Sequence, residues 1–195
     1  MGDNGILTKA NEAKIETENS QNTEIEKLNN IEDEITNITG VNWEEAFKTA
    51  TKHPDQQYST AIGLGTNGKV VNMDLWEFTL LEDDTYGLNT LENLNTDVSS
   101  GVTSGYKGKF TETGQIEGTI PQYISEDNGK TYKEVTDLKW LFFNCTEMKV
   151  APKIPSTVKK INYTFRDCTS LINTPLIPNN VEEMHRSLQG CINLE

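Results

Sequence analysis

The sequence predicts an α+β protein, in which a long N-terminal helix and a small antiparallel sheet precede an incomplete C-terminal solenoid of repeats. Three changes of pattern along the 195 residues indicate this fold. Apolar residues first recur at helical spacing, the period then becomes two with frequent glycine from about residue 60, and a repeat with a step of 23 residues fills the end of the chain. We therefore predict an N-terminal helical stalk (1–58), an antiparallel β region (59–134) and a repeat region (135–195).

One apolar stripe marks the N-terminal helix. Its members lie three or four residues apart, at Ile25, Leu28, Ile31, Ile35 and Ile38. This spacing is typical of an amphipathic helix, which Gly40 can end. A second, shorter helix is predicted from Trp43 to Thr51, because Asn42 can cap its start and Pro54 stops it.

The middle region has the alternation of β-strands. Residues 69–81 alternate apolar and polar side chains and predict one strand with a bulge, and 106–110 and 115–120 predict two short strands joined by a turn. The dipeptides Asn67-Gly68 and Asn128-Gly129 are typical of tight turns. Residues 89–105, rich in Asn, Thr and Ser, predict a surface loop.

The repeat follows the pattern V-x-x-[LIM]-x-x-x-[FL]-x-x-C-x-x-[ML]-x-x-x-P-x-I-P without an insertion. Its first positions are Val135, Val158 and Val181, and its cysteines are Cys145, Cys168 and Cys191. Apolar residues at fixed offsets in a period of this length are typical of a solenoid, in which each unit buries its apolar side against the next.

The segments FRDCTSL and PLIP stand at the offsets of the BspA-like leucine-rich repeats of bacterial surface proteins, which the pattern resembles over residues 135–195. The resemblance implies a leucine-rich-repeat solenoid with a concave strand from Leu171 to Ile177 and a convex turn or half-helix from Val158 to Phe165. It also implies an extracellular, cell-surface protein whose partners are proteins or glycans on host or neighbouring cells.

The segment GDNGILTKANEAKIETE is similar to the stretch that follows the membrane helix in pilin-like proteins of Gram-positive gut bacteria. This resemblance implies that a membrane anchor precedes Met1 in the parent protein, so that the membrane is reached only through a segment missing from this chain. Because the last repeat stops at Glu195, we also expect further repeats downstream.

The charge limits the classes of partner. With 17 Lys and Arg against 30 Asp and Glu, the net charge is −13. Nucleic acids and anionic membrane surfaces attract clustered cations, so neither is expected as a partner.

Enzymatic chemistry finds little support in the sequence. No nucleophile elbow, zinc-protease or phosphate-loop motif occurs, and the two histidines, His53 and His185, stand alone in their segments. We predict no enzyme, no cofactor and no metal site. The three equally spaced cysteines admit three readings, namely a ladder of buried thiols, a disulfide or a metal site.

We take as candidate binding residues those at repeat positions where the side-chain type differs from one unit to the next. A position that varies in this way faces either a ligand or merely solvent. The set comprises Lys139, Asn162 and His185, then Trp140, Tyr163 and Arg186, and finally Lys153 and Leu176. The sequence thus predicts a non-enzymatic surface binding or adhesion module; the alternative is a structural pilin-like subunit that assembles through its N-terminal helix.

Overall fold

The structure, a computed structural model, describes residues 40–88, 106 and 108–195. The chain divides into two compact parts, residues 1–41 and residues 42–195, and the second part is considered by itself below. The long helix predicted over residues 25–38 and the loop predicted over 89–105 lie outside the described residues. The predicted domain boundary between residues 134 and 135 falls inside a strand, β6 (Lys133–Asp137).

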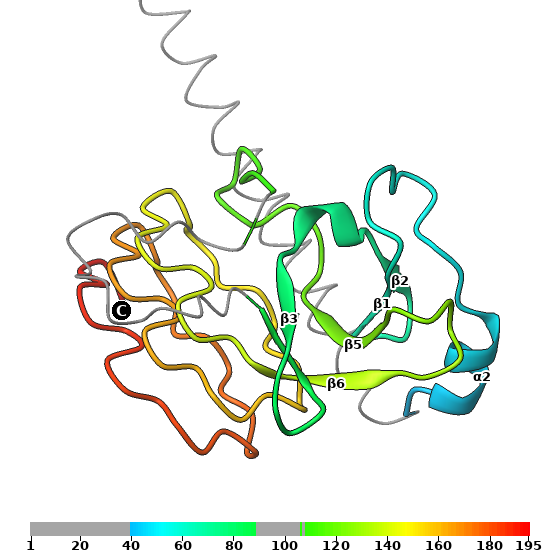
Figure 1. Cartoon of the computed structure of the whole chain (residues 1–195). Coiled ribbons are helices and arrows are strands. Elements are labelled where there is room, and N and C mark those ends of the chain that lie inside the picture. The colour runs from blue at the N-terminus through cyan, green and yellow to red at the C-terminus, as the bar shows by residue number, and fades with distance from the viewer. Residues whose placement is uncertain (1–39, 89–105, 107) are drawn as a thin grey trace, which may run out of the picture. The chain divides into compact units, whose positions relative to one another are not determined.

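One open six-stranded mixed sheet organises residues 42–195, with the strand order β2-β1-β5-β6-β4-β3 (Figure 1). The other strands are β1 (Ile62–Gly65), β2 (Val70–Val71), β3 (Phe78–Leu80), β4 (Tyr86–Leu88) and β5 (Pro121–Ser125). Every neighbouring pair is antiparallel except β4 and β6, which are parallel.

The helix predicted to start at Trp43 is confirmed as α2 (Trp43–Thr49). The side chain of Asn42 accepts a hydrogen bond from the Glu45 N–H at 3.1 Å, which satisfies one of the donors that a helix start leaves unpaired. Trp43 and Phe47 pack their rings against Tyr123 of β5, with ring centroids 4.7 and 5.2 Å apart, so the helix is fixed to the sheet.

The single strand predicted over residues 69–81 is wrong. It is divided into β2, a short 3-10 helix η1 (Met73–Leu75) and β3. Asn72 causes the break, because its side chain accepts a hydrogen bond from the Asp74 N–H at 3.0 Å and caps the helical turn. The strands predicted at 106–110 and 115–120 reduce to single bridges, Trp76 with Tyr106 and Phe110 with Ile116.

Both predicted tight turns are confirmed. Gly68 has a φ of 74°, and its N–H donates to the Gly65 carbonyl at 3.0 Å in the turn between β1 and β2. Asn128 and Gly129 both have positive φ, 62° and 82°, between β5 and β6. Two successive left-handed residues are typical of the turn that joins twisted antiparallel strands.

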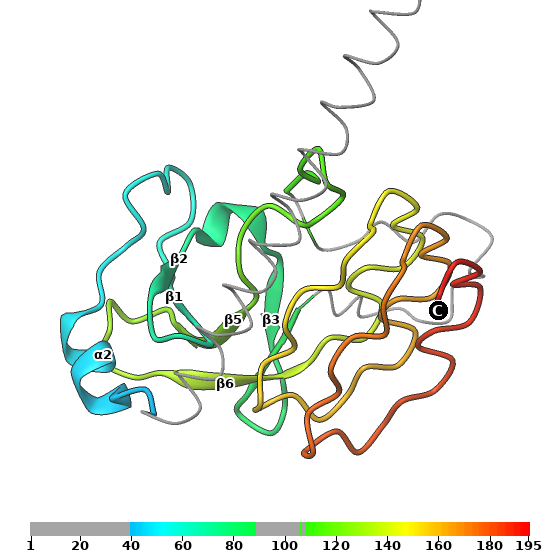
Figure 2. The same ribbon diagram turned by 180° about the vertical axis from the view of Figure 1, so that it is seen from behind.

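From Val135, inside β6, the repeats follow one another as three units: unit 1 (135–157), unit 2 (158–180) and unit 3 (181–195). Figures 1 and 2 show them as successive coils, from yellow to red, beside the sheet. Parallel bridges join Asp137 to Lys160 and Lys160 to Glu183. Most apolar positions of the repeat are buried in the first two units, with Phe142 and Phe165 fully inaccessible and their ring centroids 5.6 Å apart, whereas Cys145 and Ile177 are partly buried.

The predicted fold class is wrong for the described residues. They contain one short α-helix and a single mixed sheet in a mostly β fold, rather than a long helix, an antiparallel sheet and a leucine-rich-repeat solenoid. The expected strand from Leu171 to Ile177 and the expected half-helix from Val158 to Phe165 are turns and irregular backbone.

The physical reason is the backbone conformation of the units. Two residues in each unit have positive φ, at Trp140 and Asn144, at Tyr163 and Asp167, and at Arg186 and Gly190. A left-handed residue interrupts both a right-handed helix and an extended strand, so neither can continue through a unit. The period of the sequence therefore specifies which residues are buried without specifying a regular element.

Within the same described ranges, the structure holds no helix with the length and apolar character that crossing a bilayer requires.

Candidate functional site

The candidate site begins with a backbone position that recurs in the three units. Trp140, Tyr163 and Arg186 have φ values of 66°, 58° and 52°, a region that bulky side chains seldom adopt. The amide of Trp140 donates to the Asn162 carbonyl at 3.1 Å, and that of Tyr163 to the His185 carbonyl at 3.0 Å. These bonds fix the side chains of neighbouring units in one register. Strained positions of this kind cluster at functional sites and motivate a search there.

Side chains at and beside this position form one row of rings. The rings of Trp140 and Tyr163 stack face to face, with centroids 4.1 Å apart and planes inclined by 4°. His185 meets Tyr163 edge-on at 5.3 Å. The Arg166 guanidinium carbon lies 5.8 Å from the ring centroids of both Phe143 and Tyr163. We call the set Trp140, Phe143, Tyr163, Arg166 and His185 the aromatic row.

The exposure of the row rises from unit 1 to unit 3. Trp140 is 5% exposed, Tyr163 is half-buried and His185 is exposed. A ligand would therefore meet the edge of Tyr163, His185 and the neighbouring Arg186 rather than the face of Trp140. The buried Trp140 ring stacks on one face of the Tyr163 ring and holds it in place. Stacked aromatic pairs contribute about 0.5–1.5 kcal/mol of stability beyond the burial of their surface.

Asn162 ties unit 2 to unit 3 beside the row. Its side-chain N–H donates to Glu183 at 2.7 Å, and its side-chain oxygen accepts from the His185 N–H at 2.7 Å. The side chain is 8% exposed, so Asn162 is a structural bridge. The hydrogen bond from Asn162, followed by that from Lys160, lowers the pKa of Glu183 and keeps it ionised beside His185.

The remaining candidate positions are separate. The backbone N–H of Lys139 donates to Asp137 at 2.8 Å, and burial raises the pKa of Asp137 although that bond and the nearby lysines oppose it. Lys153 is exposed, and Leu176 is 87% exposed. Neither of these two takes part in the ring contacts of the row. The structure thus joins four candidates through ring contacts and hydrogen bonds, namely Trp140, Tyr163, Asn162 and His185. These contacts do not include Lys139, Lys153, Leu176 or Arg186.

Sequence reasoning missed Phe143 and Arg166. Both occupy the position three residues after Trp140 and Tyr163, and the third unit has Gln189 there. This position also changes chemistry at constant register, which is the signal that selected the other candidates. Its variation could therefore have identified both residues.

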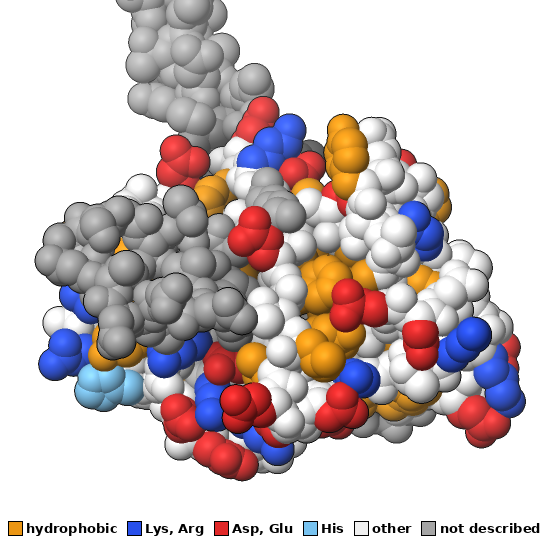
Figure 3. Space-filling view, viewed as in Figure 1, with side chains coloured by type: hydrophobic (Ala, Val, Ile, Leu, Met, Phe, Trp, Pro, Cys, Tyr) orange, Lys and Arg blue, Asp and Glu red, His pale blue; other side chains and the backbone are white. Residues whose placement is uncertain are grey.

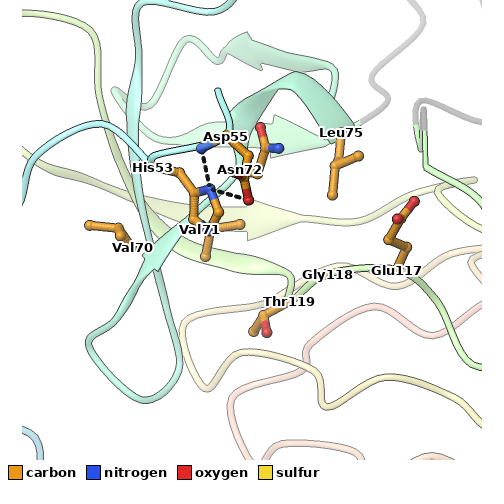
Figure 4. Close-up of a pocket in the computed structure, with 9 residues that line it drawn as sticks. All are labelled: His53, Asp55, Val70, Val71, Asn72, Leu75, Glu117, Gly118 and Thr119. Atoms are coloured by element: carbon orange, nitrogen blue, oxygen red, sulfur yellow. Dashed lines mark hydrogen bonds and ion pairs between the residues drawn. The ribbon is translucent and has the colours of Figure 1, made fainter. Parts of the chain in front are cut away.

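A second feature is a shallow pocket of about 380 Å³ beside η1 and β2 (Figure 4). Figure 4 shows His53 and Asp55 on one side of it and Glu117 on the other. The His53 Nδ1 accepts a hydrogen bond from the Asp55 backbone N–H at 3.2 Å, so this nitrogen is already engaged. In residues 40–88, 106 and 108–195, no serine, threonine or cysteine side chain hydrogen-bonds to His53, and the hydroxyl residue Thr119 also lines the pocket.

The three cysteines are free thiols. The Cys168 thiol donates to the Phe142 carbonyl at 3.1 Å and the Cys191 thiol to the Phe165 carbonyl at 3.0 Å, so each thiol reaches into the preceding unit. Burial raises the pKa of Cys145 to about 12 and also raises the pKa of Cys168 and Cys191. The structure shows the cysteines unpaired, with Cys168 buried and Cys145 and Cys191 half-buried, an arrangement that agrees with the thiol ladder.

The aromatic row offers ring surface, an imidazole and a guanidinium for contact with a ligand. Such side chains can bind a planar ligand group, whether that group is apolar or polar. Tyr and Arg are also enriched among the interface residues that contribute most of the binding free energy. Figure 3 shows acidic and basic side chains interspersed over the part of its face that is not grey. Comparisons of the chain with protein-family models, curated proteins and solved structures found no match.

Proposed function

We propose that this protein is a non-enzymatic binding or adhesion module displayed at a cell surface, which contacts a protein or glycan on a host or neighbouring cell through the aromatic row. The stacking of Trp140 on Tyr163 at 4.1 Å, with His185 at the exposed end, carries the proposal. A rigid aromatic side chain loses little conformational entropy when a ligand is bound, which favours such a row as a contact surface.

Charge and neighbouring groups support this use of the row. Arg166 lies against two rings and next to Asp167, at 3.3 Å between Nε and the carboxylate oxygen. The row therefore presents donors beside apolar ring surface, which suits the mixed polar and apolar face of a sugar or of a peptide side chain. The resemblance of the repeat to bacterial surface proteins points to the same class of function.

The test compares two variants of the whole chain for adhesion to fixed epithelial cells. The first combines Tyr163→Ala with His185→Ala, and the second is Tyr58→Ala. Tyr58 is 85% exposed and outside the row, so it is a matched control for the loss of a surface ring. We expect the row variant to bind about tenfold more weakly, as the loss of one or two contact side chains of about 1 kcal/mol each implies.

Treatment of the cells separates the two ligand classes. Loss of binding after periodate oxidation would indicate a glycan, and loss after protease alone would indicate a protein. Unchanged binding by the row variant, equal loss by Tyr58→Ala, or no adhesion by the unaltered chain would each contradict the proposal. Near-ultraviolet circular dichroism of each variant shows whether the fold is retained.

A further inference from the structure

Both arginines of the chain lie in neighbouring turns of the repeat. Of the 17 Lys and Arg residues, only Arg166 and Arg186 are arginines. The first ends the turn 163–166 of unit 2 and the second begins the turn 186–189 of unit 3, and a backbone hydrogen bond of 3.2 or 3.3 Å closes each turn. The Asp167 N–H donates to the last carbonyl of the second turn at 2.8 Å, so the two turns lie side by side. Arginine differs from lysine in its planar fork of donors, which matches an oxyanion, and the chain places this side chain only here.

The Arg166 guanidinium is held in place but lacks a hydrogen-bond acceptor. Its central carbon lies 5.8 Å from the ring centroids of Phe143 and Tyr163. Its Nε lies 3.3 Å from the Asp167 carboxylate and makes no hydrogen bond. Within the described part of the chain, no oxygen accepts a hydrogen bond from any of the guanidinium N–H groups. Polar groups buried in a folded protein nearly always have a partner, so this side chain calls for one.

Only the outer end of the guanidinium can meet a ligand. The side chain of Arg166 is 24% exposed, and its Nε is buried, so solvent reaches the side chain at the two terminal nitrogens, Nη1 and Nη2. Coplanar N–H groups on these nitrogens match the two oxygens of a carboxylate, and such bidentate pairs are stronger than neutral hydrogen bonds. Because two rings and Asp167 already hold the guanidinium, little conformational freedom is lost on binding.

The open end of Arg166 does not arise from the place where the sequence stops. Arg166 belongs to the middle unit, with Phe143 at its position in unit 1 and Gln189 at its position in unit 3. Each unit stacks only on its neighbours. A further unit after Glu195 would therefore stack on unit 3 and would leave the surroundings of Arg166 as they are.

The charges near Arg166 favour a ligand with a single carboxylate. Asp167 lies against the guanidinium, Glu183 is ionised beside His185, and the net charge of the chain is −13. A peptide with several acidic side chains would bring further carboxylates close to these two, and like charges at short range weaken binding. Hydroxyl groups have no such cost, because they donate to carboxylates and to an imidazole and accept from the exposed Arg186.

We infer that the ligand of the aromatic row is a sugar with one carboxylate, such as a uronic acid residue of a glycan, and that Arg166 binds this carboxylate through Nη1 and Nη2. Tyr163 contacts both Arg166 and His185, so the sugar lies along the exposed edge of Tyr163 and its hydroxyls reach His185 and Arg186. The inference rests on the proposed function, because it names the ligand class of the same row. It makes Arg166 the residue that determines specificity for an acidic sugar.

The probe is D-glucuronate, titrated into the full chain at constant ionic strength and about pH 7, where its carboxyl group is ionised. The Nε–Hε signals of the two arginines are followed by NMR, and the Arg166→Lys variant assigns them by the loss of one signal. We expect the Arg166 signal to shift saturably with a millimolar Kd. D-Glucuronamide, in which an amide replaces the carboxylate, should bind at least about tenfold more weakly, and triglutamate should bind more weakly than D-glucuronate.

Two variants separate the planar fork from charge alone. Arg166→Lys keeps the charge but removes the fork, so its Kd for D-glucuronate, measured from the Arg186 signal, should rise at least about tenfold. Lys130→Gln is the matched control, because Lys130 is an exposed cation in the turn between β5 and β6, and its Kd should not change. Near-ultraviolet circular dichroism verifies the fold of each variant, and the comparison of D-glucuronate with its amide on the unaltered chain needs no variant.

Four outcomes would each overturn the inference. They are the absence of a saturable shift at Arg166, which would show that another group already fills the fork, equal binding of D-glucuronamide, tighter binding of triglutamate, and an unchanged Kd for Arg166→Lys. If D-glucuronate fails while Tyr163→Ala with His185→Ala still reduces adhesion to cells, the proposed function stands and only the acidic sugar is refuted. If D-glucuronate binds but the chain does not adhere to cells, only the proposed function is refuted.

Discussion

Phe165→Ala tests whether unit 2 is enclosed by its neighbours. The side chain is inaccessible to solvent and stacks on Phe142 of unit 1, with the planes inclined by 20°. Burial of a phenylalanine removes roughly 150–250 Å² from water. At about 25 cal/mol per Å² this corresponds to roughly 4–6 kcal/mol, an upper bound because the alanine Cβ stays buried. Measured losses for such changes are about 3–5 kcal/mol.

Leu188→Ala is the matched comparison, because Leu188 occupies the same repeat position in the partly uncovered unit 3. We expect it to cost about 1–2 kcal/mol, since a half-buried leucine has less to lose and the site can collapse. Urea unfolding followed by tryptophan fluorescence gives both free energies of unfolding. Equal losses, or a loss below about 1.5 kcal/mol for Phe165→Ala, would refute the reasoning that units 1 and 3 enclose unit 2.

Two further predictions follow from the thiols and from a turn. Alkylation by iodoacetamide at about pH 8 should modify Cys191, which is half-buried, faster than Cys168, which is inaccessible and whose raised pKa keeps it a thiol. Mass spectrometry measures both rates, and we expect them to differ by at least about tenfold; equal rates would contradict the thiol ladder. The pKa of Asp127 lies well below its ordinary value of 3.8, because the Thr131 hydroxyl and N–H and the Ser125 hydroxyl donate to the carboxylate. When the pKa of a carboxyl group is lower in the folded state than in the unfolded state, its ionised form stabilises the fold at any pH above the unfolded-state pKa. This stabilisation is lost as the pH falls through the folded-state pKa. The melting temperature of the unaltered chain should therefore fall more steeply between about pH 5 and pH 2 than that of Asp127→Asn, and parallel curves would show that the carboxylate adds nothing.

The candidate site could be found in part from the sequence. Trp140 and Tyr163 share one repeat position and His185 occupies the position before it, both of which vary between units, and the structure brings the three rings together. Their exposure could not be foreseen, because Trp140 and Asn162 are buried by contacts within and between units, although their positions vary like surface positions. Comparing the three units shows at which positions the side-chain type changes. Whether such a position is buried depends on which other segments pack against it in the folded chain.

Predictions from local sequence were confirmed where a single residue sets the backbone conformation around it. Asn42 caps α2, and the pairs Asn67-Gly68 and Asn128-Gly129 make their turns, because a cap or a left-handed residue acts within a few positions of the chain. The repeat likewise specified the buried ladder of Phe142, Phe165 and Cys168.

Non-local pairing lay beyond the sequence. The parallel contact of β4 with β6 joins Tyr86 to Val135 across 49 residues, and no local pattern distinguishes that partner from an adjacent strand. The sequence by itself determined the step of 23 residues, the turn positions and most of the buried positions in the first two repeat units, since these depend on side-chain chemistry and local conformation. Only the tertiary structure decided that the units are chains of turns beside a mixed sheet, because hydrogen bonds between distant segments depend on how the whole chain packs.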